Sequence, residues 1–190
     1  MGTLFVDKLD PQSGTSLEIG SSGDTITIPA GATITNNGTQ TGFGGVNTPS
    51  FFVSKTSDQS ITDATWTKVT FDTEDYDTNS AFTSSTFTVP SGEAGKYFFF
   101  STLRCTASSG TMDYALFRFY KNGSTDLTPF QLSVATNQLK NSHIAGSAIY
   151  DLSVGDYIEV YGQISGTSPS IGGASGRNDR SFFGGYKLIT

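Results

Sequence analysis

The sequence predicts an all-β protein whose larger part is a jelly-roll sandwich, and three observations support this. Charged residues make up only 15% of the chain, against about 25% in typical domains, and Gly, Phe, Ser and Thr take their place, which favours strands and turns. No window shows a sustained 3.6-residue apolar period, so no helix is predicted. Turn signals recur through residues 51–190 at the intervals of a sandwich or jelly roll.

The expected strands follow one another from residue 51 onward, each rich in aromatic and β-branched residues. They cover residues 51–55, 65–71, 81–89, 96–105, 114–121, 130–134, 143–152, 157–163 and 182–189. Turns are predicted at Pro90-Ser91-Gly92, Lys121-Asn122-Gly123 and Val154-Gly155-Asp156. The number of strands fits the roughly eight to ten of a jelly roll.

Several of these strands are apolar on both faces. Alternate residues of a strand point to opposite sides, so Phe98 and Phe100 share one face and Tyr97 and Phe99 the other. The interior of a sandwich takes only one of these faces, and we expect another copy of the chain to cover the second. The alternative is a large core covered by loops. The residues expected at the interface of a homotrimer are Tyr97, Phe99, Tyr114, Tyr120, Phe182 and Tyr186.

Residues 1–48 are predicted to form an extended β-rich arm that is separate from the head at 49–190. Three short units, at residues 16–23, 24–31 and 32–38, each end in a Gly turn, and a Gly-rich linker follows them. Each unit has only two or three apolar side chains, too few to offset an ordering entropy of about 1 to 2 kcal/mol per residue. We therefore expect the arm to find its core in other chains. The alternative is a flexible leader that becomes ordered on a partner.

The charge balance argues against nucleic acid as a partner. The net charge is −6 and the few basic residues are scattered, whereas phosphate binding needs clustered Lys and Arg. The sequence shows neither a secretion signal nor an apolar run of about 18 residues, so we expect folding in the cytoplasm and no membrane insertion. Cys105 is the only cysteine, which excludes an intrachain disulfide.

No catalytic site is predicted. His143 is the only histidine, and neither Gly-x-Ser-x-Gly nor His-Glu-x-x-His occurs. A cysteine nucleophile would need Cys105 beside His143. We expect a protein that is not an enzyme.

The acidic segment at residues 72–77 is the candidate cation site. Glu74, Asp75 and Asp77 offer the carboxylate oxygens that Ca²⁺ prefers. The alternative is a solvated loop in which the Asp residues stabilise turns. No other cofactor is expected.

The long loop at residues 165–180 is the candidate recognition loop, because long loops on rigid sandwiches commonly carry binding residues. The candidate receptor contacts are Arg177, Asn178, Asp179 and Arg180. The alternative is that the arginines pair with carboxylates of a neighbouring subunit and lock the trimer.

The order of several segments within residues 51–190 resembles that of a C1q-like domain. The segments that carry the resemblance are Phe51-Phe52-Val53, Trp66-Thr67-Lys68-Val69-Thr70-Phe71, Phe87-Thr88-Val89-Pro90, Gly95-Lys96-Tyr97-Phe98-Phe99, Lys121-Asn122-Gly123, Gly155-Asp156-Tyr157-Ile158-Glu159-Val160 and Phe182-Phe183-Gly184-Gly185-Tyr186-Lys187-Leu188. The resemblance implies a C1q/TNF-like jelly roll that assembles as a homotrimer. Unlike the animal proteins, this chain lacks a collagen-like stalk and Cys pairs.

Residues 4–15 and 23–34 resemble N-terminal segments of tailed-phage structural proteins, especially the fibres of marine phages. This resemblance implies a virion protein, assembled in the host cytoplasm, whose arm binds other virion proteins through Leu4, Phe5, Val6 and Leu9. The head would then be the knob of a tail or head fibre that engages a receptor or glycan on the host surface. The alternatives are a capsid decoration protein without a receptor role and an adhesive, lectin-like C1q module.

Overall fold

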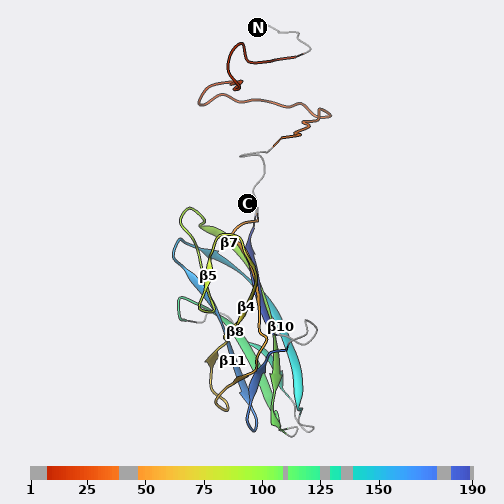
Figure 1. Cartoon of the computed structure of the whole chain (residues 1–190), viewed down its shortest axis with the longest axis vertical. Coiled ribbons are helices and arrows are strands. Elements are labelled where there is room, and N and C mark those ends of the chain that lie inside the picture. Colours follow the sequence, from red (N-terminus) through yellow and green to blue (C-terminus); the bar gives the residue numbers. More distant parts are fainter. Residues whose placement is uncertain are drawn as a thin grey trace. The chain divides into compact units, whose positions relative to one another are not determined.

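The computed structural model describes residues 8–38, 47–108, 111–124, 129–133, 139–174 and 181–188. The chain divides into two compact units, Met1–Phe43 and Gly44–Thr190, called the arm and the head below (Figure 1). No helix in the described part of either unit is long and apolar enough to cross a membrane.

In the arm, residues 8–38 contain turns but no strand. The predicted turns at Gly23 and Gly31 are present, with φ angles of 94° and 84°, and the Ala32 amide donates to the Pro29 carbonyl at 3.1 Å. The β stretches expected between the turns do not form in a single chain, because their apolar side chains have nothing to pack against. These side chains, which are between 45% and 60% exposed, are Leu9, Leu17, Ile19, Ile26, Ile28 and Ile34.

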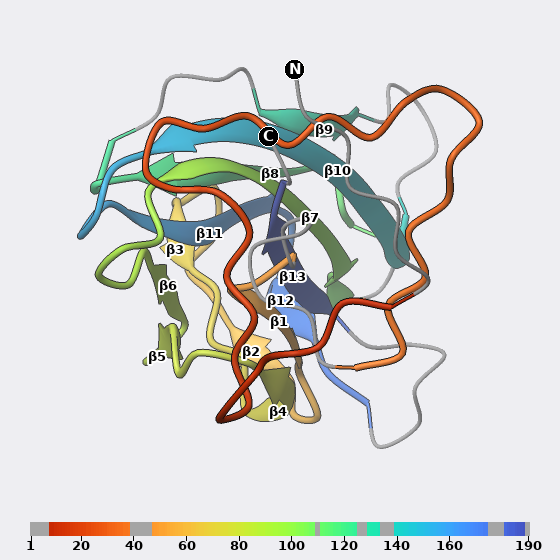
Figure 2. The same cartoon turned by 90° about the horizontal axis from the view of Figure 1, so that it is seen from above.

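The head is a sandwich of two antiparallel sheets (Figure 2). Its strands are β1 Ser50–Ser54, β2 Gln59–Ser60, β3 Thr67–Lys68, β4 Thr73–Asp77, β5 Phe82–Thr83, β6 Thr86–Thr88, β7 Gly95–Thr106, β8 Tyr114–Lys121, β9 Phe130–Ser133, β10 Asn141–Leu152, β11 Tyr157–Ser165, β12 Ser170–Gly172 and β13 Phe182–Lys187. The first sheet has the order β2-β12-β7-β13-β1-β4, with β10 on the other edge of β7. The second has the order β5-β6-β11-β8-β9, with β3 beside β11.

The predicted all-β fold is confirmed. Every predicted strand segment contains a strand, although residues 65–71 provide only β3 and residues 81–89 divide into the hairpin of β5 and β6. Three strands were not expected. β2 and β12 are very short, and β4 occupies the acidic segment for which the sequence suggests a cation site or, as the alternative, a solvated loop.

Aromatic rings fill the space between the sheets. Phe51 lies at the centre, with ring centroids 5.1 Å from Phe82, 5.0 Å from Phe87 and 4.9 Å from Phe183. Tyr97 is fully buried beside them, and burial, together with the charge of Glu93, raises the pKa of its hydroxyl to about 12. This core fixes β1, β7 and β13 of the first sheet against β6 of the second.

The head has a proximal end, where the chain enters from the arm. The Lys187 amide donates to the Pro49 carbonyl at 3.0 Å, and the Leu188 amide donates to the Lys96 carbonyl at 2.8 Å, so the first and last residues of the head meet at the start of β7. β7 then runs for 12 residues, or about 36 Å at 3.3 Å per residue, to Thr106. We call the end of the head around Thr106 the distal end.

Candidate functional site

The outer face of the first sheet carries an aromatic surface. Along β7, inward and outward side chains alternate strictly: Tyr97 and Phe99 are fully buried in the core, whereas Phe98 and Phe100 are partly exposed on the outside. Rings from β1, β4 and β13 lie beside them. The outer aromatic face consists of Phe52, Tyr76, Phe98, Phe100, Phe182 and Tyr186.

The rings of this face form one connected cluster. The Phe52 ring lies 5.5 Å from that of Phe182 and 6.1 Å from that of Phe100. The Phe98 ring lies 6.1 Å from Phe100 and 5.5 Å from Tyr186. Ile149 of β10 pairs with Phe98 in the sheet register and is 60% exposed, which extends the apolar surface to the next strand.

Two glycines of β13 allow rings to lie across this strand on both faces. A Cβ at Gly184 would come within 2.6 Å of Phe100 Cζ on the outside, and a Cβ at Gly185 would come within 2.5 Å of Phe99 Cδ1 on the inside. Glycine inside a strand often marks such a close approach. Because Gly184 and Gly185 have no Cβ, the Phe100 ring can pack against the outer face of β13 and the Phe99 ring against its inner face.

The predicted trimer interface is wrong for two residues. Tyr97 and Phe99 belong to the core, so the outward face of β7 is the one that carries Phe98 and Phe100. The alternation showed two faces, but both were aromatic, so it did not indicate which one points inward. Of the other predicted residues, Phe182 and Tyr186 lie on the outer aromatic face, while Tyr114 and Tyr120 lie on the outer face of the second sheet.

The outer face of the second sheet is also aromatic, but its rings have polar partners. The Arg118 guanidinium lies 4.1 Å from the centre of the Trp66 ring, and the Tyr120 and Tyr161 rings stack at 4.0 Å. Lys68 forms an ion pair with Glu159 at 2.7 Å. Burial raises the pKa of Tyr161, and the neighbouring Glu159 carboxylate adds to the shift.

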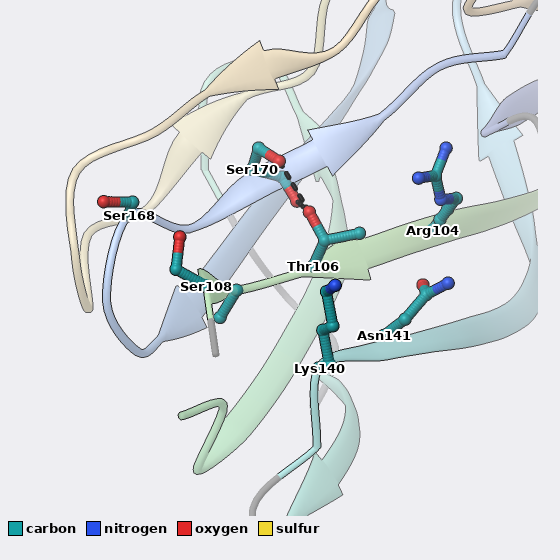
Figure 3. A pocket seen from close by; sticks show the side chains of 8 residues that line it. Arg104, Thr106, Ser108, Lys140, Asn141, Ser168 and Ser170 are labelled. Atoms are coloured by element: carbon teal, nitrogen blue, oxygen red, sulfur yellow. Dashed lines mark hydrogen bonds between the residues drawn. The ribbon is translucent and has the colours of Figure 1, made fainter. Parts of the chain in front are cut away.

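A polar cavity of about 520 Å³ lies at the distal end of the head (Figure 3). It is bordered by the last residues of β7, the first of β10 and the segment that leads into β12. Its lining residues are Arg104, Thr106, Ala107, Ser108, Lys140, Asn141, Ser168 and Ser170. Two of these are basic and none is acidic.

Hydrogen bonds position two parts of the cavity wall. The Thr106 and Ser170 hydroxyls lie 2.6 Å apart, which ties β7 to β12. Arg104 Nη1 donates to the Gly173 carbonyl at 2.9 Å and lies 3.9 Å from the Asp58 carboxylate. In Figure 3 the side chain of Lys140, the residue before β10, extends toward Thr106.

The predicted metal site is not assembled. Asp77 accepts hydrogen bonds from the Phe82 and Asn79 amides at 2.8 and 3.4 Å, and Asp75 accepts one from the Ser54 hydroxyl at 3.3 Å. Within the described ranges, no group of three or more His, Cys, Asp and Glu side chains is placed to hold a metal ion. Glu74, Asp75 and Asp77 lie along β4 and do not converge on one point.

Asp72, just before β4, shows the structural role that an acidic residue takes here. Its carboxylate accepts hydrogen bonds from the amides and hydroxyls of Thr56 and Ser57. Burial alone would raise the pKa of this carboxyl, but these hydrogen bonds outweigh burial and hold the pKa well below its usual range. The carboxylate therefore fastens the segment after β1 to the start of β4.

Cys105 and His143 do not form a catalytic pair. Cys105 is fully buried on the inner face of β7, and burial raises the pKa of its thiol to about 12. His143 pairs with Arg104, the residue before Cys105, in the register of β10 with β7 and is exposed on the outer face. The nucleophile and base that this mechanism requires are thus separated by the sheet.

Several predicted site residues lie outside the described residues. These are the candidate receptor contacts Arg177, Asn178, Asp179 and Arg180, and the candidate anchors Leu4, Phe5 and Val6. The fourth anchor, Leu9, is 51% exposed in the arm. Ser168 and Ser170 of the distal cavity belong to the predicted recognition loop at residues 165–180, but the cavity itself was not predicted, because its other residues come from two separate segments without a recognisable motif.

Comparisons with known proteins identify the fold of the head. No family model matches the sequence, and the search of curated proteins found no match. Among solved structures, the globular domain of zebrafish complement 1qA protein matches with a TM-score of 0.50 at 18% identity, over 74% of this chain and 97% of that one. Murine APRIL at pH 8.0 matches with a TM-score of 0.51 at 16% identity, over 73% and 98%.

The Eiger TNF structure from S. frugiperda matches with a TM-score of 0.53 at 15% identity, over 73% of this chain and 91% of that one. At these identities the similarity concerns the fold alone. The head therefore has the C1q/TNF-like jelly-roll fold that its sequence resembles.

Proposed function

We propose that this protein is a non-enzymatic structural and recognition protein that assembles as a homotrimer through its head. The outer aromatic face is the observation that carries this proposal. Soluble monomers rarely expose a large contiguous apolar patch, and such patches mark sites of protein association. A connected cluster of six rings, extended by Ile149, is a patch of this kind.

A second copy of the chain is the partner that this surface fits best. Fully burying an exposed aromatic side chain contributes about 1.5 to 3 kcal/mol of favourable free energy. Because the rings of the outer aromatic face are already partly buried, covering them with a second copy would contribute only part of that free energy. The net charge of −6 makes copies repel one another, so a contact between copies is most favourable where apolar side chains meet. In a closed ring each copy contacts two neighbours, and three copies form a small ring of this type.

The arm gives the proposed trimer its place in a larger structure. Its six exposed aliphatic side chains lack a core of their own, and other copies or another protein would cover them. Together with the resemblance to phage fibre segments, this supports a virion appendage whose arm binds other virion proteins and whose head engages the host surface. We therefore propose the virion as the location of the protein. The alternative, a capsid decoration protein, would have the same trimer and the same arm but would bind no receptor.

An adhesive C1q-type module is the second candidate function. It is favoured by the fold that the head shares with zebrafish complement 1qA protein. The two functions differ in the partner of the arm and make the same prediction for the head.

The mass of the full-length chain in solution tests the proposed trimer. We expect light scattering to give three times the chain mass of 20.1 kDa. Phe98→Ser with Phe100→Ser should lower the mass to that of the monomer while the circular dichroism of the β-sheet stays the same. Tyr161→Ser, on the outer face of the second sheet, is the matched control and should remain trimeric.

Two results would contradict the proposal. A wild-type chain that is monomeric at high concentration would show that the outer aromatic face does not bind further copies. A double variant that remains trimeric would place the contact elsewhere, for example in the arm.

A further inference from the structure

We propose that the distal cavity binds an acidic sugar, meaning a saccharide unit that carries a carboxylate or a sulfate. This inference rests on the proposed function, because it supplies the ligand class for a recognition head. The size of the cavity fits: about 520 Å³ lies within the range of roughly 300 to 1,000 Å³ that is usual for small-molecule sites.

The lining matches the hydroxyl groups of a sugar. The side chains of Thr106, Ser108, Ser168 and Ser170 provide hydroxyls, each able to donate and to accept, and Asn141 provides an amide with both functions. A sugar presents several hydroxyls at fixed angles and needs both kinds of partner. Among the lining residues that the structure describes, Ala107 alone is apolar, so a lipid chain or an aromatic ligand would find little there to pack against.

The charge of the lining selects an acidic ligand. Arg104 and Lys140 border the cavity, and the described residues of its lining include no carboxylate. This is a local reversal in a chain that has 17 acidic and 11 basic residues. An anion at this point gains charge-assisted hydrogen bonds, which are about twice as strong as neutral ones.

The two cations contribute in different ways. Arg104 is held in place by the Gly173 carbonyl and faces Asp58 at 3.9 Å, so it mainly shapes the wall and its potential. Lys140 forms no ion pair within the described residues, and its side chain extends toward Thr106 (Figure 3). We assign Lys140 as the direct contact of the acidic group.

The position of the cavity suits recognition. It lies at the distal end of the head, about 36 Å along β7 from the proximal end where the chain enters from the arm. A receptor that contacts this end of the head can therefore reach the cavity. Strands β7, β10 and β12 of the first sheet contribute Arg104, Thr106, Asn141 and Ser170 to its wall.

A titration of the full-length protein with three sugars tests the inference. The probes are galacturonic acid, galactose 6-sulfate and galactose, which differ only at carbon 6. Measured by saturation-transfer NMR and calorimetry at low salt, the two acidic sugars should bind at least tenfold more tightly than galactose. Because the acidic group adds an ionic attraction, this difference should shrink as the salt concentration rises.

Three variants locate the site. Lys140→Gln should weaken binding of galacturonic acid about tenfold and bring it close to that of galactose. Asn141→Asp, which places a carboxylate in the cavity without a change in size, should abolish binding of both acidic sugars. Lys96→Gln is the matched control: it removes the same charge at the start of β7, at the proximal end, and should leave binding unchanged.

Each other outcome overturns the inference. Equal affinities for galactose and galacturonic acid would show that the acidic group is not recognised, and no binding of either acidic sugar would show that the cavity is not a sugar site. Equal losses in Lys96→Gln and Lys140→Gln would indicate unspecific attraction to positive charge. The mass is measured on the same samples, so a trimer that binds no acidic sugar contradicts this inference alone, and a monomer that binds it contradicts the proposed assembly alone.

Discussion

The two outer faces of the sandwich are both rich in aromatic side chains, yet different kinds of side chain contact these rings on each face. On the second sheet, Arg118 covers the Trp66 ring. The stacked Tyr120 and Tyr161 rings are neighbours of the Lys68–Glu159 ion pair, because Tyr120 pairs with Glu159 and Tyr161 with Lys68 in the sheet register. On the first sheet, the rings of the outer aromatic face contact mainly one another.

On the second sheet, charged groups of the same chain cover the aromatic surface, whereas on the first sheet part of the aromatic surface has no such cover. A cation over a ring, or a charged pair beside it, covers aromatic surface and keeps water in contact with charge. Rings that meet only other rings still expose their outer sides to water. Aromatic content alone therefore does not identify an interface, and the partners of each ring must be known.

The largest predicted effect compares two neighbouring residues of β7. Phe99→Ala removes a fully buried ring from the core and should destabilise the head by about 3 to 5 kcal/mol in urea unfolding. Phe100→Ala removes a partly exposed ring from the outer aromatic face. It should leave the free energy of unfolding of the single chain nearly unchanged. It should also make the urea midpoint independent of protein concentration, because the trimer no longer forms.

An equal loss of stability in the two variants would refute the assignment of Phe99 to the core and Phe100 to the outer aromatic face. If Phe100→Ala lowered the stability as much as Phe99→Ala, and did so at every protein concentration, both rings would belong to one core. The outer aromatic face would then be covered within the chain.

Most of the fold could be predicted from the sequence because strands leave local signals. The turn at Lys121-Asn122-Gly123 is an example: Asn122 and Gly123 both adopt positive φ angles, of 51° and 74°, as the Asn-Gly pair indicates. β4 was missed because the acidic residues of its sequence are typical of loops. It forms nevertheless, since β1 offers a free edge with which it pairs.

The candidate site was less predictable, because it depends on contacts between distant residues. The pattern of residues 97–100 showed that two aromatic faces exist, but only the packing of Phe99 against Phe87 and Phe183 decides which face is inside. The distal cavity joins Arg104 to Lys140, which are far apart in the sequence. No local pattern records such a pair.

An intermediate effect is predicted for the ion pair on the second sheet. Lys68→Ala removes the partner of Glu159, which is only 9% exposed and also accepts a hydrogen bond from the Thr86 hydroxyl. We expect a loss of about 1 to 2 kcal/mol in urea unfolding and no change in mass, since this pair completes a face within one chain. The exposed pair of Lys96 with Asp151 is the control, and Lys96→Ala should change the stability by less than about 0.5 kcal/mol.

The smallest predicted effect concerns the cation over the indole. Arg118→Gln keeps the first part of the side chain but removes the guanidinium that lies over the Trp66 ring, and should cost about 0.5 to 1 kcal/mol. Trp66 is the only tryptophan, so a change in its fluorescence reports the loss of this contact directly. Tyr120→Phe, on the same face, leaves the Arg118–Trp66 contact intact and should leave the fluorescence unchanged.

The mass of the Arg118→Gln variant shows whether the outer face of the second sheet takes part in assembly. If Arg118→Gln dissociates the trimer, this face takes part in assembly, as the prediction of Tyr114 and Tyr120 at the interface requires. If the trimer persists, the charges of this face serve one chain only, and assembly depends on the outer aromatic face of the first sheet.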